Sequence, residues 1–332
     1  MIVQLLKKKR FLISFLFLSA LLLLSIGNTL INDGEIQQIR YVKDSDGGVK
    51  HAPPYAPLEV FLLGSDRFGF DLLHMIVEGA KYTIGMTILI ALLRMICSLI
   101  FSYFICSMKP FFFKLIKTLS EPFSVVPQTI FAFFLLHSVL WMPPEGFQST
   151  MFERVAFHTA VLVLIAVPSL SMQLSGEIRM TLDESFIEAS KTLGGRKSHL
   201  FMKHIIPVLY ERWMLLFGQQ LIQVLLLLAH LGVFKLFFGG TVVSYGMGGD
   251  PPRTFSYEWS GMIGDSLGYL YVQQWIALVP ISFFAVTAIC FSLMNDALKE
   301  VIFNGDPKRA PDTSAEVTPA SKSGSGPFHI IQ

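Results

Sequence analysis

Long apolar runs are the feature that most constrains the fold of this chain. Each run is near or above the roughly 20 apolar residues that a helix needs to cross the hydrocarbon core of a bilayer. They lie near residues 11–31, 79–107, 118–142, 155–175, 213–234 and 272–294. Because an isolated segment in lipid satisfies its backbone hydrogen bonds only as a helix, the runs predict an all-α, polytopic membrane protein with about six transmembrane helices.

The composition agrees with a membrane protein. Hydrophobic residues make up 52% of the 332 residues and charged residues only 15%, and the mean hydropathy is +0.56. The chain is therefore more apolar and less charged than a typical soluble domain. A formal net charge of +2 is too small to indicate nucleic acid as a partner. The three cysteines, Cys97, Cys106 and Cys290, lie inside apolar runs, which favours packing over an extracellular disulfide framework.

The distribution of basic residues predicts the orientation. Lys7, Lys8, Lys9 and Arg10 precede the first apolar run, and no Ala-x-Ala site ends that run, so we interpret it as an uncleaved first span. Six spans place the connecting segments alternately on the two sides of the membrane. Most lysine and arginine residues then lie on the side of the amino terminus, which is the cytoplasmic side by the positive-inside rule. Both termini are therefore expected in the cytoplasm, with the chain in the cell membrane.

These boundaries give a predicted organisation in four parts. Residues 1–31 form the cytoplasmic amino terminus and the first span, and residues 32–78 an extracytoplasmic segment. Residues 79–295 form a five-span core that includes a cytoplasmic loop at 178–210. Residues 296–332 form a cytoplasmic tail, expected to be disordered from residue 305 because it is rich in Pro, Ser and Thr.

The cytoplasmic loop reads as a folded element. Ser185 and Glu188 have the spacing of a capping box, which predicts a helix start. Gly194 and Gly195 are expected to end that helix, because glycine readily adopts the left-handed conformation of helix ends. A second, basic helix is predicted from about residue 196 to 206, with Pro207 resetting the chain before the next span.

The loop resembles the EAA loop of binding-protein-dependent ABC importer permeases. The matching residues are Glu188-Ala189-Ser190, Gly194 and Ile205-Ile206-Pro207. Three further segments are similar to the oligopeptide, dipeptide and nickel type of permease, the inner-membrane component with a long outer segment. They are residues 64–73, 258–263 and 295–299.

The resemblance implies an ABC importer type I permease fold and a function as the membrane-spanning subunit of an ATP-driven importer for peptides or a similar small solute. The implied partners are a second permease subunit, two ABC ATPase subunits and an extracytoplasmic solute-binding protein, besides membrane lipid. The chain itself would bind no cofactor and would not be an enzyme, since ATP and Mg would bind the ATPase subunits. The implied ATPase-coupling residues are Glu188, Ala189, Ser190, Gly194, Gly195, Ile205 and Pro207.

An alternative remains open on the same residues. Phe70, His74 and Met75 stand where the family pattern has Arg, Ser and Arg, so the outer segment has lost polar groups. A non-transporting sensor or scaffold subunit of an ABC-type complex would keep the loop and lose the solute route.

Polar residues inside the spans are candidates for that route, because they are costly in hydrocarbon unless they face protein or water. For Arg94 two positions are expected, facing the pathway or facing an acidic group of a partner subunit. Interhelical hydrogen bonding is an equally good interpretation of each glutamine. The candidate pathway residues are Arg94, Gln128, Gln173, Gln219 and Gln223, with Gln220 beside them.

Two other classes of site are disfavoured. The segment 194–198 has glycines before a lysine, but Arg196 stands where a phosphate-binding loop needs glycine. His137, His158 and His230 lie in different spans without carboxylates or cysteines at ligand spacing, which argues against a metal site.

Overall fold

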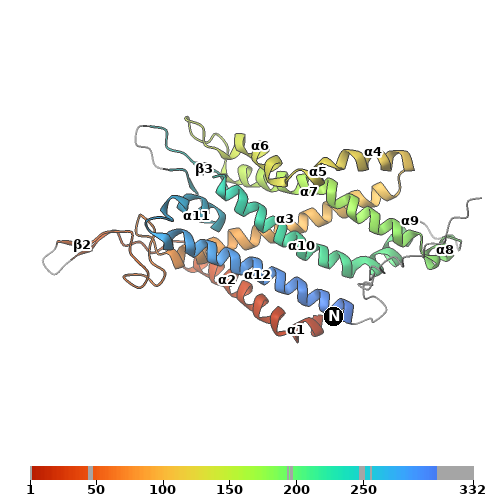
Figure 1. Ribbon diagram of the computed structural model, residues 1–332, viewed down its shortest axis with the longest axis horizontal. Helices are drawn as coiled ribbons and strands as arrows, with labels where there is room; N and C mark the ends of the chain where they lie inside the picture. Colours follow the sequence, from red (N-terminus) through yellow and green to blue (C-terminus); the bar gives the residue numbers. More distant parts are fainter. Residues whose placement is uncertain are drawn as a thin grey trace, which may run out of the picture.

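Helices running along one long axis make up most of the computed structural model (Figure 1), which describes residues 2–43, 48–192, 194, 197–246, 251–254 and 256–304. The helices are α1 (Ile2–Leu6), α2 (Lys9–Asn32), α3 (Leu72–Cys106), α4 (Pro110–Ser120), α5 (Pro122–Val125), α6 (Gln128–Leu140), α7 (Met151–Leu182), α8 (Ser185–Thr192), α9 (Lys197–Leu200), α10 (Ile206–Val233), α11 (Trp259–Ser266) and α12 (Gln274–Asn304). A π-helical turn, Phe201–Ile205, joins α9 to α10, and a 3-10 turn, Leu267–Tyr269, follows α11.

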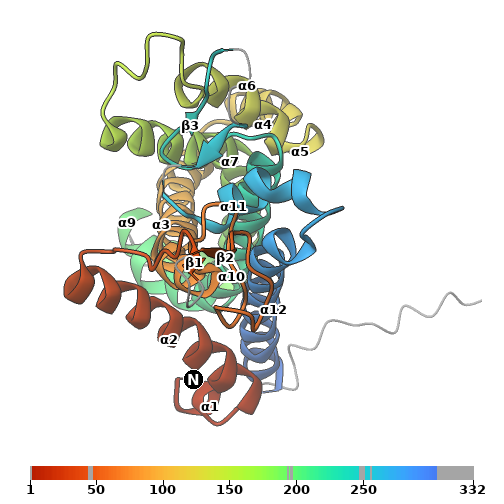
Figure 2. The same cartoon turned by 90° about the vertical axis from the view of Figure 1, so that its left-hand side faces the viewer.

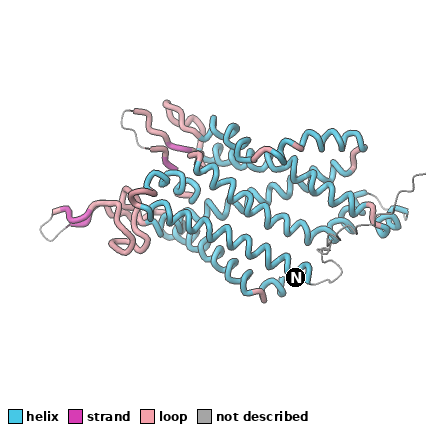
Figure 3. Tube along the Cα trace, viewed as in Figure 1, coloured by secondary structure: helices cyan, strands magenta, loops and turns pink. Residues whose placement is uncertain are grey.

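Within the described residues, the strands form two short antiparallel pairs at one end of the molecule (Figure 3). β1 (Val42–Lys43) pairs with β2 (Val49–His51), and β3 (Thr241–Val242) pairs with β4 (Arg253–Thr254). We call this end, which also carries α11, the hairpin end. The opposite end carries α1, α8 and α9 (Figure 1), and we call it the amino-terminal end.

Five of the described helices are long and apolar enough to cross a membrane, and a bent pair makes up to six. The five are Lys9–Asn32, Leu72–Cys106, Met151–Leu182, Ser198–Val233 and Gln274–Phe303. The pair is Pro110–Val125 with Gln128–Leu140, bent by 85°. The predicted all-α, polytopic fold with about six membrane-crossing elements is confirmed.

The third crossing is not the single helix that its apolar run suggests. Val126 is extended and Pro127 caps α6, since a proline ring disfavours helical backbone in the residue before it and removes one N–H donor. Pro168 and Pro280, by contrast, lie inside continuous helices. Proline alone therefore does not explain the break in the third crossing, since the prolines of α7 and α12 do not interrupt their helices.

α3 lies at the centre of the bundle. Viewed from the hairpin end (Figure 2), α2 lies at one edge, α4, α5 and α6 at the opposite edge, and α3, α10 and α12 between them. The main core is built from side chains that are completely buried, among them Ile84 of α3, Leu162 of α7 and Leu225 of α10. Each span thus buries one stripe against its neighbours and leaves another stripe for lipid or protein.

The two ends of the described chain meet at the amino-terminal end. Lys8 Nζ lies 2.6 Å from Glu300 Oε1, and Leu5 packs against Leu298 and Ile302 of α12. α12 continues to Asn304, so residues 296–304 extend the last helix. Residues 305–332, for which disorder is predicted, lie outside the described residues.

The boundary between α9 and α10 corrects the prediction for Pro207. Helical backbone continues from Lys197 through the π-helical turn into α10, and Pro207 lies in its first turn. Proline is tolerated there because the preceding wider turn leaves room for its ring and its missing N–H is not needed. Pro207 therefore continues a span and does not reset the chain.

The first helix of the loop also differs from its predicted cap. α8 begins at Ser185 as expected, but the N–H of Glu188 donates to the carbonyl of Glu184 at 3.2 Å and not to the Ser185 hydroxyl. Ser185 is thus the first helical residue and not the residue before it. A complete capping box is present elsewhere, between Thr150 and Glu153 at the start of α7.

Glycines let α11 pack directly on the last turn of α10. A Cβ atom at Gly232 would overlap the carbonyl oxygen of Ser260, and one at Gly264 would overlap the carbonyl oxygen of Gly232. Trp259 of α11 packs on α3: it is fully buried and its Nε1 donates to the carbonyl of Ile76 at 2.9 Å. α11 is therefore held tightly between α3 and α10.

Replacing Gly232 by alanine should destabilise the protein by about 1–3 kcal/mol, because both neighbouring backbones must move to admit the methyl group. The measurement is the Tm of the purified protein in detergent. Gly176→Ala is the control, since a Cβ there meets nothing within 4 Å and alanine favours the helix. Equal Tm values for the two variants would contradict the packing described here.

Candidate functional site

The break in the third crossing leaves a groove between α5, α7 and α10. Its volume is about 550 Å³. It is lined by Phe123, Ser124, Val125, Val126, Pro127, Gln128, Ala166, Ser169, Leu170, Met172, Gln173, Gln220 and Gln223. Because α6 turns away by 85° from the preceding helix, no described helix covers this stretch of α7 and α10.

Four of the predicted pathway residues or their neighbours meet in this groove. Gln128 begins α6, Gln173 is exposed on α7, and Gln220 and Gln223 lie one turn apart on α10. Gln219 is exposed but does not line the groove, because it points about 100° away from Gln220 around the helix. The structure therefore gathers amides from three spans on one concave face and leaves Gln219 outside it.

Arg94 lies behind the wall of the groove. Its side chain is 0% exposed, its Nε donates to the carbonyl of Leu162 at 2.9 Å, and its Nη1 donates to Gln220 Oε1 at 3.4 Å. Gln220 Nε2 in turn donates to Gln223 Oε1 at 2.9 Å. Arg94 is therefore buried against α7 and α10 of its own chain, and its position facing the pathway or a partner subunit stays a prediction.

The loop residues lie at the amino-terminal end, and most of them are accessible. Glu188 and Ala189 are exposed on α8, and Gly194 has a φ of +85° in open space. Ser190 is half-buried beside His204, at 3.3 Å between Oγ and Nε2. Gly195 lies outside the described residues.

Two buried isoleucines anchor this loop. Ile205 in the π-helical turn is 2% exposed, as part of a cluster with Leu174, Ile178 and Leu209. Ile187 of α8 is 0% exposed, and sequence reasoning missed it. α8 thus turns Ile187 inward and presents Phe186, which is 44% exposed, outward.

A second groove lies beside α8. Its volume is about 510 Å³, and it lies between the ends of α7 and α12 and the start of α10. Its lining is mostly apolar, with Glu184, Glu211 and Arg212 as the charged residues. The apolar side is formed by Met180, Phe186, Val208, Leu209, Ile302 and Phe303.

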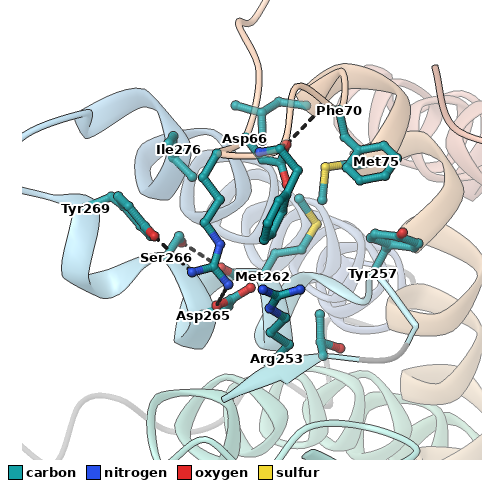
Figure 4. Close-up of a pocket in the computed structure, with 14 residues that line it drawn as sticks. Asp66, Phe70, Met75, Arg253, Tyr257, Met262, Asp265, Ser266, Tyr269 and Ile276 are labelled. Atoms are coloured by element: carbon teal, nitrogen blue, oxygen red, sulfur yellow. Dashed lines mark hydrogen bonds and ion pairs between the residues drawn. The ribbon is translucent and has the colours of Figure 1, made fainter. Parts of the chain in front are cut away.

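A third pocket, of about 200 Å³, lies at the hairpin end. The guanidinium groups of Arg67 and Arg253 lie 4.6 Å and 4.3 Å from the ring centre of Phe68. Arg67 Nη1 donates to Tyr269 Oη at 3.2 Å, and its Nη2 lies 3.9 Å from Asp265 Oδ1. Figure 4 shows Asp265, Arg253 and Tyr269 around the same space.

Burial controls the carboxylates of this pocket. Burial raises the pKa of Asp265 to about 6, against the opposing effect of Arg67 and Arg253. Burial also raises the pKa of Asp66, although its carboxylate accepts the N–H groups of Phe68 and Phe70 at 2.9 Å and 2.8 Å. The pocket is therefore an ion cluster whose charge changes near neutral pH.

The residues that depart from the family pattern serve packing here. Phe70 packs on Tyr257 at 6.4 Å between ring centres, and Met75 is 7% exposed in the core. His74 Nε2 lies 3.0 Å from Asn28 Oδ1 on α2. These residues, just before α3 and in its first turn, thus make contacts within the chain.

The part of the chain that the structure describes holds no group of three or more His, Cys, Asp and Glu residues placed to bind a metal ion.

No family model matches the chain, but curated relatives do. The chain is 20% identical over 245 residues to the peptide transport system permease protein SapC of Escherichia coli O6:H1, which covers 74% of each protein. It is 26% identical over 125 residues to the oligopeptide transport system permease protein OppC of E. coli K12, covering 38% of this chain and 36% of the relative. It is 20% identical over 147 residues to the glutathione transport system permease protein GsiD of Shigella dysenteriae, covering 44% and 43%.

These matches confirm the relationship that the loop and the outer segments predict, to permeases of the oligopeptide type. The relatives are permease subunits of transport systems, which are not enzymes themselves.

Replacing Asp265 by asparagine should raise the Tm most at about pH 7.5, less at about pH 5 and little at about pH 3.5. A pKa raised from 3.8 to about 6 means that the folded protein binds this proton more tightly than the unfolded chain. The cost of the ionised carboxylate is therefore complete above about pH 6, and it decreases as the pH falls from there to the ordinary pKa of 3.8.

The measurement is the difference in Tm between variant and wild type across this pH range. Asp33→Asn, at an exposed carboxylate after α2, is the control for the loss of a negative charge. If the Tm difference between Asp265→Asn and wild type stays constant with pH, the pKa of Asp265 is not raised by folding.

Proposed function

We propose that this chain is the membrane-spanning permease subunit of an ATP-driven importer, and that the groove between α5, α7 and α10 forms its share of the translocation pathway. The observation that carries the proposal is the set of glutamines on one concave face of the spans. The names of the relatives, which are peptide, oligopeptide and glutathione permeases, favour peptides or a similar small solute.

The groove cannot face lipid without cost. Each amide that cannot find a partner in hydrocarbon costs several kcal/mol, so polar concave surfaces at membrane depth are covered by protein or filled by water. Gln173 and Gln223 are exposed in this chain. A second permease subunit placed against α5, α7 and α10 would cover them and close the groove into a pathway.

The amino-terminal end would dock on the ATPase. There α8 presents Phe186, Glu188 and Ala189 to solvent beside the apolar groove that includes Ile302 and Phe303. α8 follows α7 directly and leads through Gly194 to α9 and α10. A movement imposed on α8 would therefore act on the two spans that form the groove walls.

The proposed topology places the amino-terminal end in the cytoplasm. Lys7 to Arg10 and the end of α12 lie there together, joined by the ion pair of Lys8 and Glu300, in agreement with the positive-inside rule. The hairpin end would then face the outside, where its strands and the charged pocket would meet an extracytoplasmic solute-binding protein. The chain would bind no cofactor itself, and ATP and Mg would bind two partner ATPase subunits.

Gly194→Val should uncouple the complex. Valine is strained at a φ of +85°, so α8 and α9 would be displaced relative to each other. We expect a tagged wild-type chain, purified from its native membranes, to carry vanadate-sensitive ATPase activity and to restore uptake of labelled trialanine in a deletion strain. The variant should lose most of both activities.

Gly146→Val is the matched control, since Gly146 has a φ of +82° with no atom near its Cβ position and lies at the hairpin end. It imposes the same strain away from the loop and should keep both activities. ATPase activity without any uptake by the wild type would favour a sensor or scaffold subunit. A wild-type chain that purifies without ATPase activity would refute the proposal.

A further inference from the structure

We propose that the groove is electropositive and takes the solute by a negatively charged, acceptor-rich group such as a carboxylate, and that Arg94 sets this preference from behind the groove wall. This inference rests on the proposed role of the groove as a pathway and adds the charge class of its solute.

The charge of Arg94 has no counter-ion in the described part of the chain. The ion pairs found there involve Lys8, His51, Arg67 and Lys81 as the basic partners, and none involves Arg94. Arginine does not lose its proton in proteins, and a charge in a medium of low dielectric constant acts over a longer distance than in water. One side chain, Gln220, separates the guanidinium from the groove.

Hydrogen bonds orient two of the amides of the groove, those of Gln220 and Gln223, in one direction. Because arginine only donates, Gln220 must present its oxygen to Arg94 and its Nε2 to Gln223 Oε1. The amide nitrogen of Gln223 remains for other partners, and it also only donates. The relay from Arg94 to Gln220 to Gln223 therefore ends in donor groups at the groove, which suit a carboxylate or a peptide carbonyl.

A purely structural role explains less. Hydrogen bonds from Arg94 to Leu162 and Gln220 do hold α3, α7 and α10 together, but a neutral donor would serve that purpose without the cost of a buried charge. Arg94 Nη2 is buried without a hydrogen-bond partner. A solute with an anionic group in the adjacent groove would compensate the charge of Arg94 during transport, which gives a reason for this buried cation and its free Nη2 donor.

The test measures the potential of the groove with charged thiol reagents. Cys97, Cys106 and Cys290 are replaced by serine, and a single cysteine is introduced at Met172, which lines the groove. In opened native membranes, the rates of reaction with an anionic sulfonate and a cationic trimethylammonium methanethiosulfonate are compared. A cysteine at exposed Gln148 of the hairpin end supplies the reference ratio.

We expect the anionic reagent to be favoured at position 172 by on the order of tenfold over the reference, the size of effect that one unit charge exerts in a partly desolvated site. Gln220→Glu should abolish this preference, because it places a carboxylate of the same shape on Arg94. Gln219→Glu adds the same charge to the neighbouring residue outside the groove and should retain most of the preference.

Three results would overturn the inference: no preference in the parent protein, equal effects of the two glutamate variants, or a cysteine at position 172 that reacts with neither reagent. Arg94→Lys supplies a second measurement should Gln220→Glu fail to accumulate, since it keeps the charge and should keep the preference. The assay needs neither ATPase nor transport. A parent protein that shows the preference for the anionic reagent but supports no uptake would therefore count against the proposed function. A parent protein that supports uptake without this preference would count against the proposed negative charge of the solute group.

Discussion

The cost of a polar group at membrane depth is the constraint on which the organisation of this protein depends. Most spans meet it by burying polar side chains within the chain, as Ser25 does on the carbonyl of Glu78 and Thr87 on the carbonyl of Thr83. The third crossing departs from this solution: its break at Val126 and Pro127 removes the helix that would cover Gln173 and Gln223. A polar face is therefore left for a partner subunit, water or a solute.

The sequence was sufficient for the elements whose signal is local. Apolar runs predicted the membrane-crossing helices, and the residues of the loop with those of two outer segments predicted the relationship that the relatives confirm. The glutamines were also recognised as candidates. Their gathering in one groove could not be predicted, because it depends on how α6, α7 and α10 are rotated about their axes, and a uniformly apolar span gives little information on that rotation.

The errors have physical causes of the same kind. Pro207 was expected to break the helix, since the π-helical turn that accommodates it leaves no pattern in the sequence. The hydrogen bonds of Arg94 to α7 and α10 could not be predicted, because arginine in a span usually faces water or a partner, whereas here its side chain is buried within the chain. The burial of Trp259 involves a glycine far away in sequence, Gly79 of α3, where a Cβ atom would lie 3.1 Å from the Trp259 ring.

The contact of Gly232 with α11 has a mechanical consequence for α10. At the hairpin end, α10 is wedged so closely that neither backbone can slide past the other, while its opposite end passes into a wide π-helical turn and the short α9. Ile205 of that turn packs with Leu174, Ile178 and Leu209, so side chains hold this end of α10, whereas backbone contact holds the end at Gly232. Side chains can repack where touching backbones cannot, so a tilt of α10 would pivot at Gly232 and be largest at the end farthest from the hairpins.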